Sequence, residues 1–243
     1  MTRARMTRAR MTRVAVVDYG AGNLVSIGQG LEAVGAEVAW APDGDSLGEA
    51  DALIVPGVGA SAPAMERLRD RGLVDPIVGW IRDGRPYLGI CLGMQLLFEG
   101  SDEDDAETLG VLPGRTVLLE DAPTLPHIGW NQVVARRPHP LFEGIGDGAD
   151  FYFVHSYAGR LAGPAADELT LAQTVHGRPF LSALARGPML GVQFHPERSG
   201  RDGLRLLANF VRLATGQARS RLADVAAPVA PAEVAAPAAV RTA

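Results

Sequence analysis

The chain contains a single cysteine, Cys91, and it stands between two glycines in the segment Gly89-Ile90-Cys91-Leu92-Gly93. An apolar run with strand character, 87–90, precedes it and a helix-compatible segment follows, so the pattern is typical of a nucleophile elbow. Glycines at these spacings let neighbouring backbone approach without a Cβ clash. A lone cysteine in an apolar stretch is more often core filler, but the flanking glycines favour a nucleophile here.

A cysteine nucleophile needs a base, and His195 has the most suggestive surroundings of the five histidines. It ends an apolar run, 189–194, and is followed by Pro196 and Glu197. Proline interrupts strand pairing, and in an extended chain residues 195 and 197 project to the same side. Glu197 could then orient the imidazole, which completes a Cys-His-Glu hydrolytic triad. Taken alone, His-Pro-Glu would also suit a surface turn.

The elements that must position these residues follow an α/β pattern. Apolar strands at 14–17, 52–55 and 87–90 are each followed by a helix-compatible segment, which predicts a parallel sheet. After residue 115 strands and turns dominate, and we expect this mixed or antiparallel region to extend the same sheet. A last helix carries an apolar stripe of Leu204, Leu207, Phe210 and Val211. We expect a three-layer α/β sandwich with a mixed, mostly parallel central sheet flanked by helices. The later strands are expected at 116–119, 127–134, 151–157, 171–175, 179–186 and 189–194.

Composition limits the class of protein. The chain has 243 residues, 47% apolar content and a formal net charge of −5, which gives no electrostatic reason to expect a nucleic-acid or membrane-surface partner. A single cysteine excludes an internal disulfide, so we expect a reducing cytoplasm. Residues 1–12 form an arginine-rich repeat and residues 218–243 an Ala/Pro-rich tail, both predicted to be disordered around a domain at 13–217.

Together, the two motifs resemble those of the triad-type, class I glutamine amidotransferases. Over about residues 13–215, the chain is similar to the glutaminase subunit of imidazole glycerol phosphate synthase. Met94, where many amidotransferases have histidine, helps to select this family. The resemblance rests on Asp18-Tyr19-Gly20-Ala21-Gly22-Asn23, Pro56-Gly57-Val58-Gly59, the run 93–99, His127-Ile128-Gly129-Trp130-Asn131 and Tyr152-Phe153-Val154-His155-Ser156-Tyr157.

The resemblance implies a role for each matching residue. Cys91 would attack the side-chain amide of glutamine, His195 would protonate the departing ammonia and then activate water, and Glu197 would hold His195. Backbone N–H groups of Leu92 and of the loop at Val58 and Gly59 would stabilise the oxyanion. The glutamine pocket would be lined by Gly57, Gln95, Glu103, His155, Ser156 and Tyr157. No cofactor and no metal are implied.

The resemblance also implies a partner. The ammonia would pass to a (β/α)₈ cyclase subunit that makes imidazole glycerol phosphate and an aminoimidazole carboxamide ribotide in histidine biosynthesis. Val58 stands where many relatives have a second glycine, so we expect low activity until the partner is occupied. The alternatives are a glutaminase serving another synthase and a catalytically silent regulatory module of the same fold.

The loop at Gly20-Ala21-Gly22 follows the first expected strand, which invites a dinucleotide-binding interpretation. The third glycine of that fingerprint would fall at Val25, so the pattern is incomplete. The resemblance places this loop, including Asn23, against the partner, and an ordinary strand-helix turn is the competing interpretation.

Overall fold

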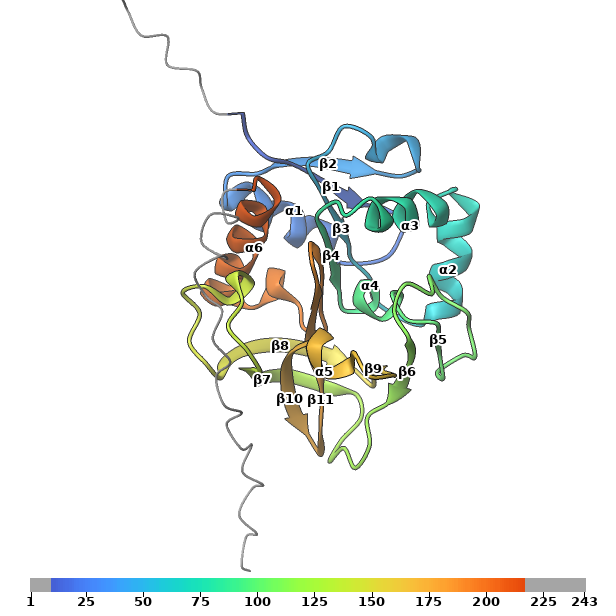
Figure 1. The fold of residues 1–243 in the computed structure, drawn as a ribbon, viewed down its shortest axis with the longest axis vertical. Helices are drawn as coiled ribbons and strands as arrows, with labels where there is room; N and C mark the ends of the chain where they lie inside the picture. The colour runs from blue at the N-terminus through green and yellow to red at the C-terminus, as the bar shows by residue number, and fades with distance from the viewer. Residues whose placement is uncertain (1–9, 217–243) are drawn as a thin grey trace, which may run out of the picture.

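The computed structural model describes residues 10–216, and Figure 1 shows how their elements are arranged. The segments predicted to be disordered, 1–12 and 218–243, lie outside the described residues except for 10–12. The first strand, β1 (Arg13–Val17), begins at the expected start of the domain. None of the helices within 10–216 combines the length and apolar character that crossing a bilayer requires.

Within the described residues, nine strands form the main sheet, in the order β2-β1-β3-β4-β12-β11-β10-β7-β8. The first five are parallel and the last four pair antiparallel, which confirms the predicted mixed α/β sheet. The sequence reasoning missed β2, a short edge strand. Besides β1, the strands are β2 (Glu37–Ala41), β3 (Ala52–Val55), β4 (Tyr87–Ile90), β7 (His127–Ala135), β8 (Ala149–His155), β10 (Thr170–His176), β11 (Arg178–Arg186) and β12 (Met189–Val192).

Helices cover both faces of the parallel half of the sheet (Figure 1). Helices α1 (Leu24–Ala33) and α6 (Gly200–Ala214) pack with one apolar cluster, while α2 (Ser61–Asp70), α3 (Val74–Arg82) and α4 (Leu92–Gln95) pack with the other. The three-layer prediction is therefore confirmed. Leu204 departs from the expected stripe of α6, because its side chain is 38% exposed. The short elements are α5 (Ala166–Leu169), η1 (Asp45–Leu47), η2 (Pro140–Phe142) and η3 (Pro196–Arg198).

A second, three-stranded sheet contains β5 (Gly100–Ser101), β6 (Gly114–Leu118) and β9 (Tyr157–Leu161). Its existence corrects two expectations. The region after 115 does not simply extend the main sheet, and the strand expected at 151–157 is divided at Ser156. The chain leaves the main sheet there and enters the second one, so Ser156 and Tyr157 lie at a corner between the two sheets.

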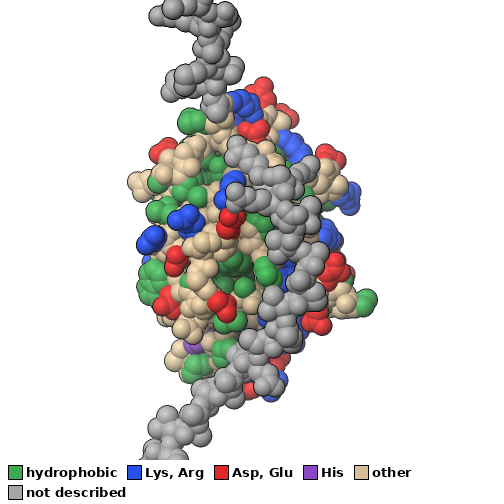
Figure 2. Space-filling model, turned by 60° about the vertical axis from the view of Figure 1, so that its left-hand side comes forward, with side chains coloured by type: hydrophobic (Ala, Val, Ile, Leu, Met, Phe, Trp, Pro, Cys, Tyr) green, Lys and Arg blue, Asp and Glu red, His purple; other side chains and the backbone are tan. Residues whose placement is uncertain are grey.

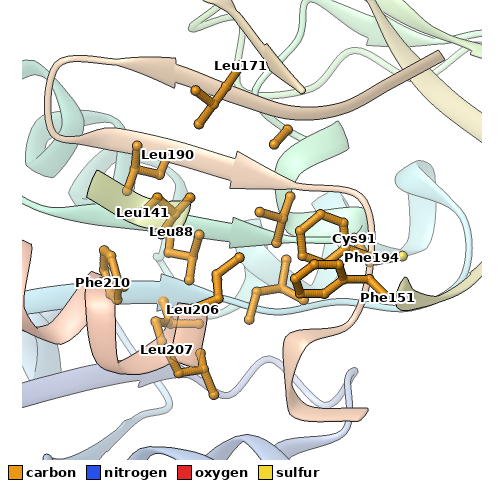
Figure 3. Packing of buried hydrophobic residues seen from close by; sticks show 14 of the residues in the cluster. Leu88, Cys91, Leu141, Phe151, Leu171, Leu190, Phe194, Leu206, Leu207 and Phe210 are labelled. Atoms are coloured by element: carbon orange, nitrogen blue, oxygen red, sulfur yellow. The ribbon is translucent and has the colours of Figure 1, made fainter. Parts of the chain in front are cut away.

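The core meets the surface at the carboxyl end of β4. Figure 3 shows Cys91 there, beside the aromatic side chains of Phe194 and Phe151, whose ring centroids are 4.2 Å apart. In open α/β sheets ligands bind outside the carboxyl ends of the strands, so the fold places Cys91 where a site is expected. On the face shown in Figure 2, acidic and basic side chains are interspersed with apolar ones.

Candidate active site

Cys91 occupies a strained turn between β4 and α4. Its φ of 53° and ψ of −110° are unusual for a residue with a side chain, and only 5% of the residue is exposed. A Cβ at Gly93 would lie 1.8 Å from the carbonyl oxygen of Val55, and one at Gly89 would lie 2.5 Å from the carbonyl oxygen of Gly93. The two glycines are therefore sterically required, and the turn has the elbow geometry that the sequence predicts.

The imidazole of His195 is held by Glu197. The Nδ1 and Oε1 atoms of these side chains are 2.8 Å apart, and both side chains are almost fully buried. The expectation of an extended chain here was wrong, because Pro196 begins the 3₁₀ helix η3, in which Arg198 N–H donates to the His195 carbonyl. The turn still brings the carboxylate to the imidazole.

The environment of His195 favours its charged form. Burial opposes the charge, but the Cys91 sulfur and the Glu197 carboxylate outweigh it and raise the pKa of His195 to about 10. Its Nε2 atom is buried without a hydrogen-bond partner within the described residues, as is Oε2 of Glu197. A thiolate beside an imidazolium is the nucleophile-base pair that acyl transfer uses.

The glycine-rich loop after β3 lies against the elbow. The Tyr19 hydroxyl donates a 3.0 Å hydrogen bond to the carbonyl of Pro56, and burial raises the pKa of this phenol, which keeps it protonated. A Cβ at Gly57 would lie 2.3 Å from that hydroxyl and 2.9 Å from the Cβ of Leu92. The loop that carries Val58 therefore contacts the first residue of α4, whose N–H has no intrahelical acceptor.

Two residues that are expected to line the glutamine pocket, Gln95 and His155, form hydrogen bonds within the protein. Nε2 of Gln95 donates to the Tyr157 carbonyl at 2.7 Å, and Nδ1 of His155 donates to the same oxygen at 2.9 Å. The other ring nitrogen of His155 is 3.3 Å from Nδ1 of His127. Burial, the largest cause, lowers the pKa of His155 to about 3. His155 therefore lies beneath the Ser156 corner as a neutral, fully engaged ring.

Glu103 stands in an acidic loop that is fastened to α2. Burial, followed by the charge of Asp104, raises the pKa of Glu103. Asp104 accepts a hydrogen bond from the backbone N–H of Ala62, in the first turn of α2. That helix begins directly after the glycine-rich loop, so the contact ties the Glu103 loop to the candidate oxyanion loop. The sequence reasoning missed Asp104, since its partner is remote in the chain.

Gln193 is the second residue that the sequence reasoning missed. It is fully buried, and its Nε2 donates to the Cys91 sulfur at 3.6 Å. It stands two positions before His195, but the partners of its side chain, Cys91 and Gln95, are about a hundred residues away in the chain, so no local pattern marks it.

The Gly20-Ala21-Gly22 loop packs beside the glycine-rich loop. A Cβ at Gly22 would lie 3.3 Å from the Cβ of Pro56, and Arg67 and Arg71 of the α2 region donate to the carbonyls of Gly20 and Asp18. These contacts connect the loop to the glycine-rich loop and to the α2 region. Across residues 10–216, no group of three potential metal ligands comes together.

Comparison with known proteins agrees with this geometry. A family described as "Glutamine amidotransferase class-I" matches residues 15–214. The imidazole glycerol phosphate synthase subunit HisH of Synechococcus elongatus is 48% identical over 202 residues, covering 82% of this chain and 92% of that protein. The HisH subunit of Dehalococcoides mccartyi is 43% identical over 204 residues, covering 84% and 98%.

Solved structures support the fold alone. The structure of PurLQS from Thermotoga maritima matches with a TM-score of 0.67 at 17% identity, covering 84% of this chain and 99% of that one. A crystal structure described as a glutamine amidotransferase matches with a TM-score of 0.64 at 24% identity, covering 83% and 98%. With the family match over the whole domain and the HisH relatives, the chain belongs to the class-I glutamine amidotransferases, among the HisH subunits of imidazole glycerol phosphate synthase.

Proposed function

We propose that Cys91, His195 and Glu197 catalyse the hydrolysis of glutamine to glutamate and ammonia. The Cys91 thiolate attacks the side-chain carbonyl carbon, and the oxyanion accepts hydrogen bonds from backbone N–H groups of Leu92 and of the loop at Val58 and Gly59. The His195 imidazolium gives its Nε2 proton to the departing ammonia. The neutral ring then takes a proton from water, which attacks the thioester and releases glutamate and the thiolate.

One observation carries this proposal. Cys91 and His195 follow the adjacent parallel strands β4 and β12. The Cys91 sulfur helps to raise the pKa of the His195 imidazole, which Glu197 holds at 2.8 Å. The unpartnered Nε2 of His195 is the atom that must exchange protons with the substrate. The pocket assignments, Gly57, Gln95, Glu103, His155, Ser156 and Tyr157, belong to the same proposal, with His155 acting through the Tyr157 carbonyl.

We propose that the ammonia passes to a (β/α)₈ cyclase subunit in a heterodimer; the HisH relatives are named as a subunit of imidazole glycerol phosphate synthase, which supports a partner subunit. Two exposed apolar side chains support a docking face on β7. Ile128 and Trp130 alternate along its outer side and are 59% and 58% exposed. The complex is proposed to work in the cytoplasm, because the Cys91 thiol must stay reduced.

The test is Cys91→Ala in the complex reconstituted with the cognate cyclase subunit. Cyclase turnover is measured once with glutamine and once with ammonium salt as nitrogen donor. We expect the glutamine-dependent rate to disappear while the ammonium-dependent rate survives, because only the first needs the thiol. Loss of both rates would show that Cys91 supports assembly, and survival of both would show that it is not the nucleophile.

A further inference from the structure

Gln193 is a buried polar residue whose side chain is satisfied at both ends. It is fully excluded from solvent, Nε2 donates to the Cys91 sulfur at 3.6 Å, and Oε1 accepts from Nε2 of Gln95 at 3.1 Å. Its backbone N–H donates to the carbonyl of Ser182 on the neighbouring strand at 2.9 Å. A buried amide with this many fixed partners has little freedom to turn.

The register of two strands puts Gln193 next to the nucleophile. In the parallel pair β4 and β12, Ile90 lies opposite Val192, and the Cys91 N–H donates to the Val192 carbonyl at 2.8 Å. Cys91 and Gln193 are the next residues along their strands. Their proximity is therefore set by backbone pairing rather than by a flexible loop.

A chain of hydrogen bonds decides which end of the Gln193 amide faces the sulfur. The Tyr157 carbonyl can only accept, so the Gln95 amide must turn its nitrogen toward it, at 2.7 Å. The same nitrogen gives its second proton to Gln193, whose oxygen must then face Gln95. The N–H₂ group of Gln193 therefore faces Cys91. The Tyr157 carbonyl thus determines, through Gln95, that Gln193 donates a hydrogen bond to the sulfur.

We propose that Gln193 is a positioning residue for the nucleophile, which presents a fixed N–H to the Cys91 sulfur with a polarity imposed through Gln95 by the Tyr157 carbonyl. The inference rests on the proposed role of Cys91. The charged and titratable groups that interact with this sulfur are His195, which Glu197 holds, and Tyr19. Gln193 adds a neutral donor that does not titrate, and an N–H donor stabilises a sulfur anion more than a neutral thiol.

The experiment is alkylation of the free chain by iodoacetamide, followed by intact-mass spectrometry between pH 6 and 9. Cys91 is the only cysteine in the chain, so every adduct reports this thiol. Gln193→Met keeps the length of the side chain but removes the N–H donor. We expect alkylation at pH 7 to slow by about tenfold, with the rate profile displaced to higher pH, because a hydrogen bond to a charged group is lost.

A second variant tests the relay itself. Gln95→Met leaves Gln193 in place but frees its amide to turn, so alkylation should slow by a smaller factor of about threefold. Ser182→Ala is the matched control: Ser182 is buried beside Gln193, and its hydroxyl makes no hydrogen bond within the described residues. The control should alkylate like the wild type, and melting curves show which variants are folded.

The outcomes separate this inference from the proposed function. Wild-type alkylation rates and profiles in a folded Gln193→Met variant would overturn the inference, as would equal slowing in Ser182→Ala. If Gln193→Met does not fold, an unchanged profile in Gln95→Met overturns it instead. Alkylation needs no turnover, so a failed glutaminase proposal would appear only in the Cys91→Ala experiment. In the activated complex, Gln193→Met should lower kcat with little change in KM, because the Gln193 side chain is fully buried and contacts the nucleophile.

Discussion

The hydroxyl of Tyr19 donates a 3.0 Å hydrogen bond to the carbonyl of Pro56, immediately before the glycine-rich loop. This bond joins the end of β1 to the candidate oxyanion loop, and Gly57 lies directly against the same hydroxyl. The buried Tyr19 hydroxyl therefore helps to fix the position of the glycine-rich loop.

Tyr19→Phe removes only this bond. We expect the free energy of unfolding to fall by about 1 kcal/mol, and kcat of the activated complex to fall by about three- to tenfold because the loop is less well fixed. Denaturant unfolding and steady-state glutaminase kinetics measure the two effects. Tyr87→Phe is the control for the loss of stability, because it also removes one buried hydrogen bond, the 2.9 Å bond from the Tyr87 hydroxyl to the Gly93 carbonyl. An unchanged kcat would mean that the loop keeps its position without the hydroxyl.

Val58 offers a test of how the loop is activated. Its side chain is 46% exposed, so replacing it removes little core packing, whereas glycine eases rotation of the adjoining peptides. Val58→Gly should raise glutamine turnover of the free chain by about fivefold and reduce the stimulation given by the ligand-bound cyclase. Val58→Ala should change turnover much less. Equal glutamine turnover by the free wild-type chain and by its complex with the ligand-bound cyclase would contradict the assumption that the partner activates this loop.

Two glycines provide a contrast in packing. A Cβ on Gly93 would lie 1.8 Å from the Val55 carbonyl, while one on Gly79 in α3 meets no atom within 4 Å. Gly93→Ala should lower the free energy of unfolding by roughly 3 kcal/mol or more and abolish glutaminase activity, because the elbow must open. Gly79→Ala should be neutral or stabilising by up to about 1 kcal/mol. Chemical denaturation measures both, and a stable, active Gly93→Ala would contradict the geometry.

Three histidines with lowered pKa values should make the fold sensitive to acid. Burial lowers the pKa of His127 and that of His139 to about 4 and that of His155 to about 3, against 6.5 without these surroundings. The unfolded chain therefore binds more protons between these values, and the free energy of unfolding should fall as pH drops from about 6.5 toward 4. His195 has the opposite sign, because its raised pKa gives stability that is lost as pH rises toward about 10.

His127→Gln tests this acid sensitivity, since the amide can still donate to His155. Melting temperatures between pH 8 and 4 should fall less steeply for the variant than for the wild type. Parallel curves would show that the fold loses stability in acid through other groups.

The parts of the site that depend on local spacing were accessible from the sequence. The glycines around Cys91 and the order His195-Pro196-Glu197 predict the elbow and the pair at 2.8 Å, because their partners are near in the chain. The parallel strands were also predictable, since continuous apolar runs mark strands buried on both faces.

Other features depend on partners far away in the chain. Alternation through residues 151–157 gives no sign that the chain changes sheets at Ser156, because both halves have strand character. Gln193 binds a sulfur and an amide about a hundred residues away, and Asp104 caps a helix that precedes it. Neither contact can be recognised from the spacing of residues in the sequence, because the partners are far apart in the chain and meet only in the folded structure.

The pairing of Ile90 with Val192 also limits how this protein can change over evolution. A one-residue slip of β12 against β4 would move Gln193 out of register with Cys91 and turn its amide away from the thiol, since successive side chains point to opposite faces. Insertions and deletions should therefore be accepted in the surface turns, such as 120–126, and rejected inside these two short strands. The alignment of two backbones, as much as the identity of any side chain, is what descendants of this sequence must preserve.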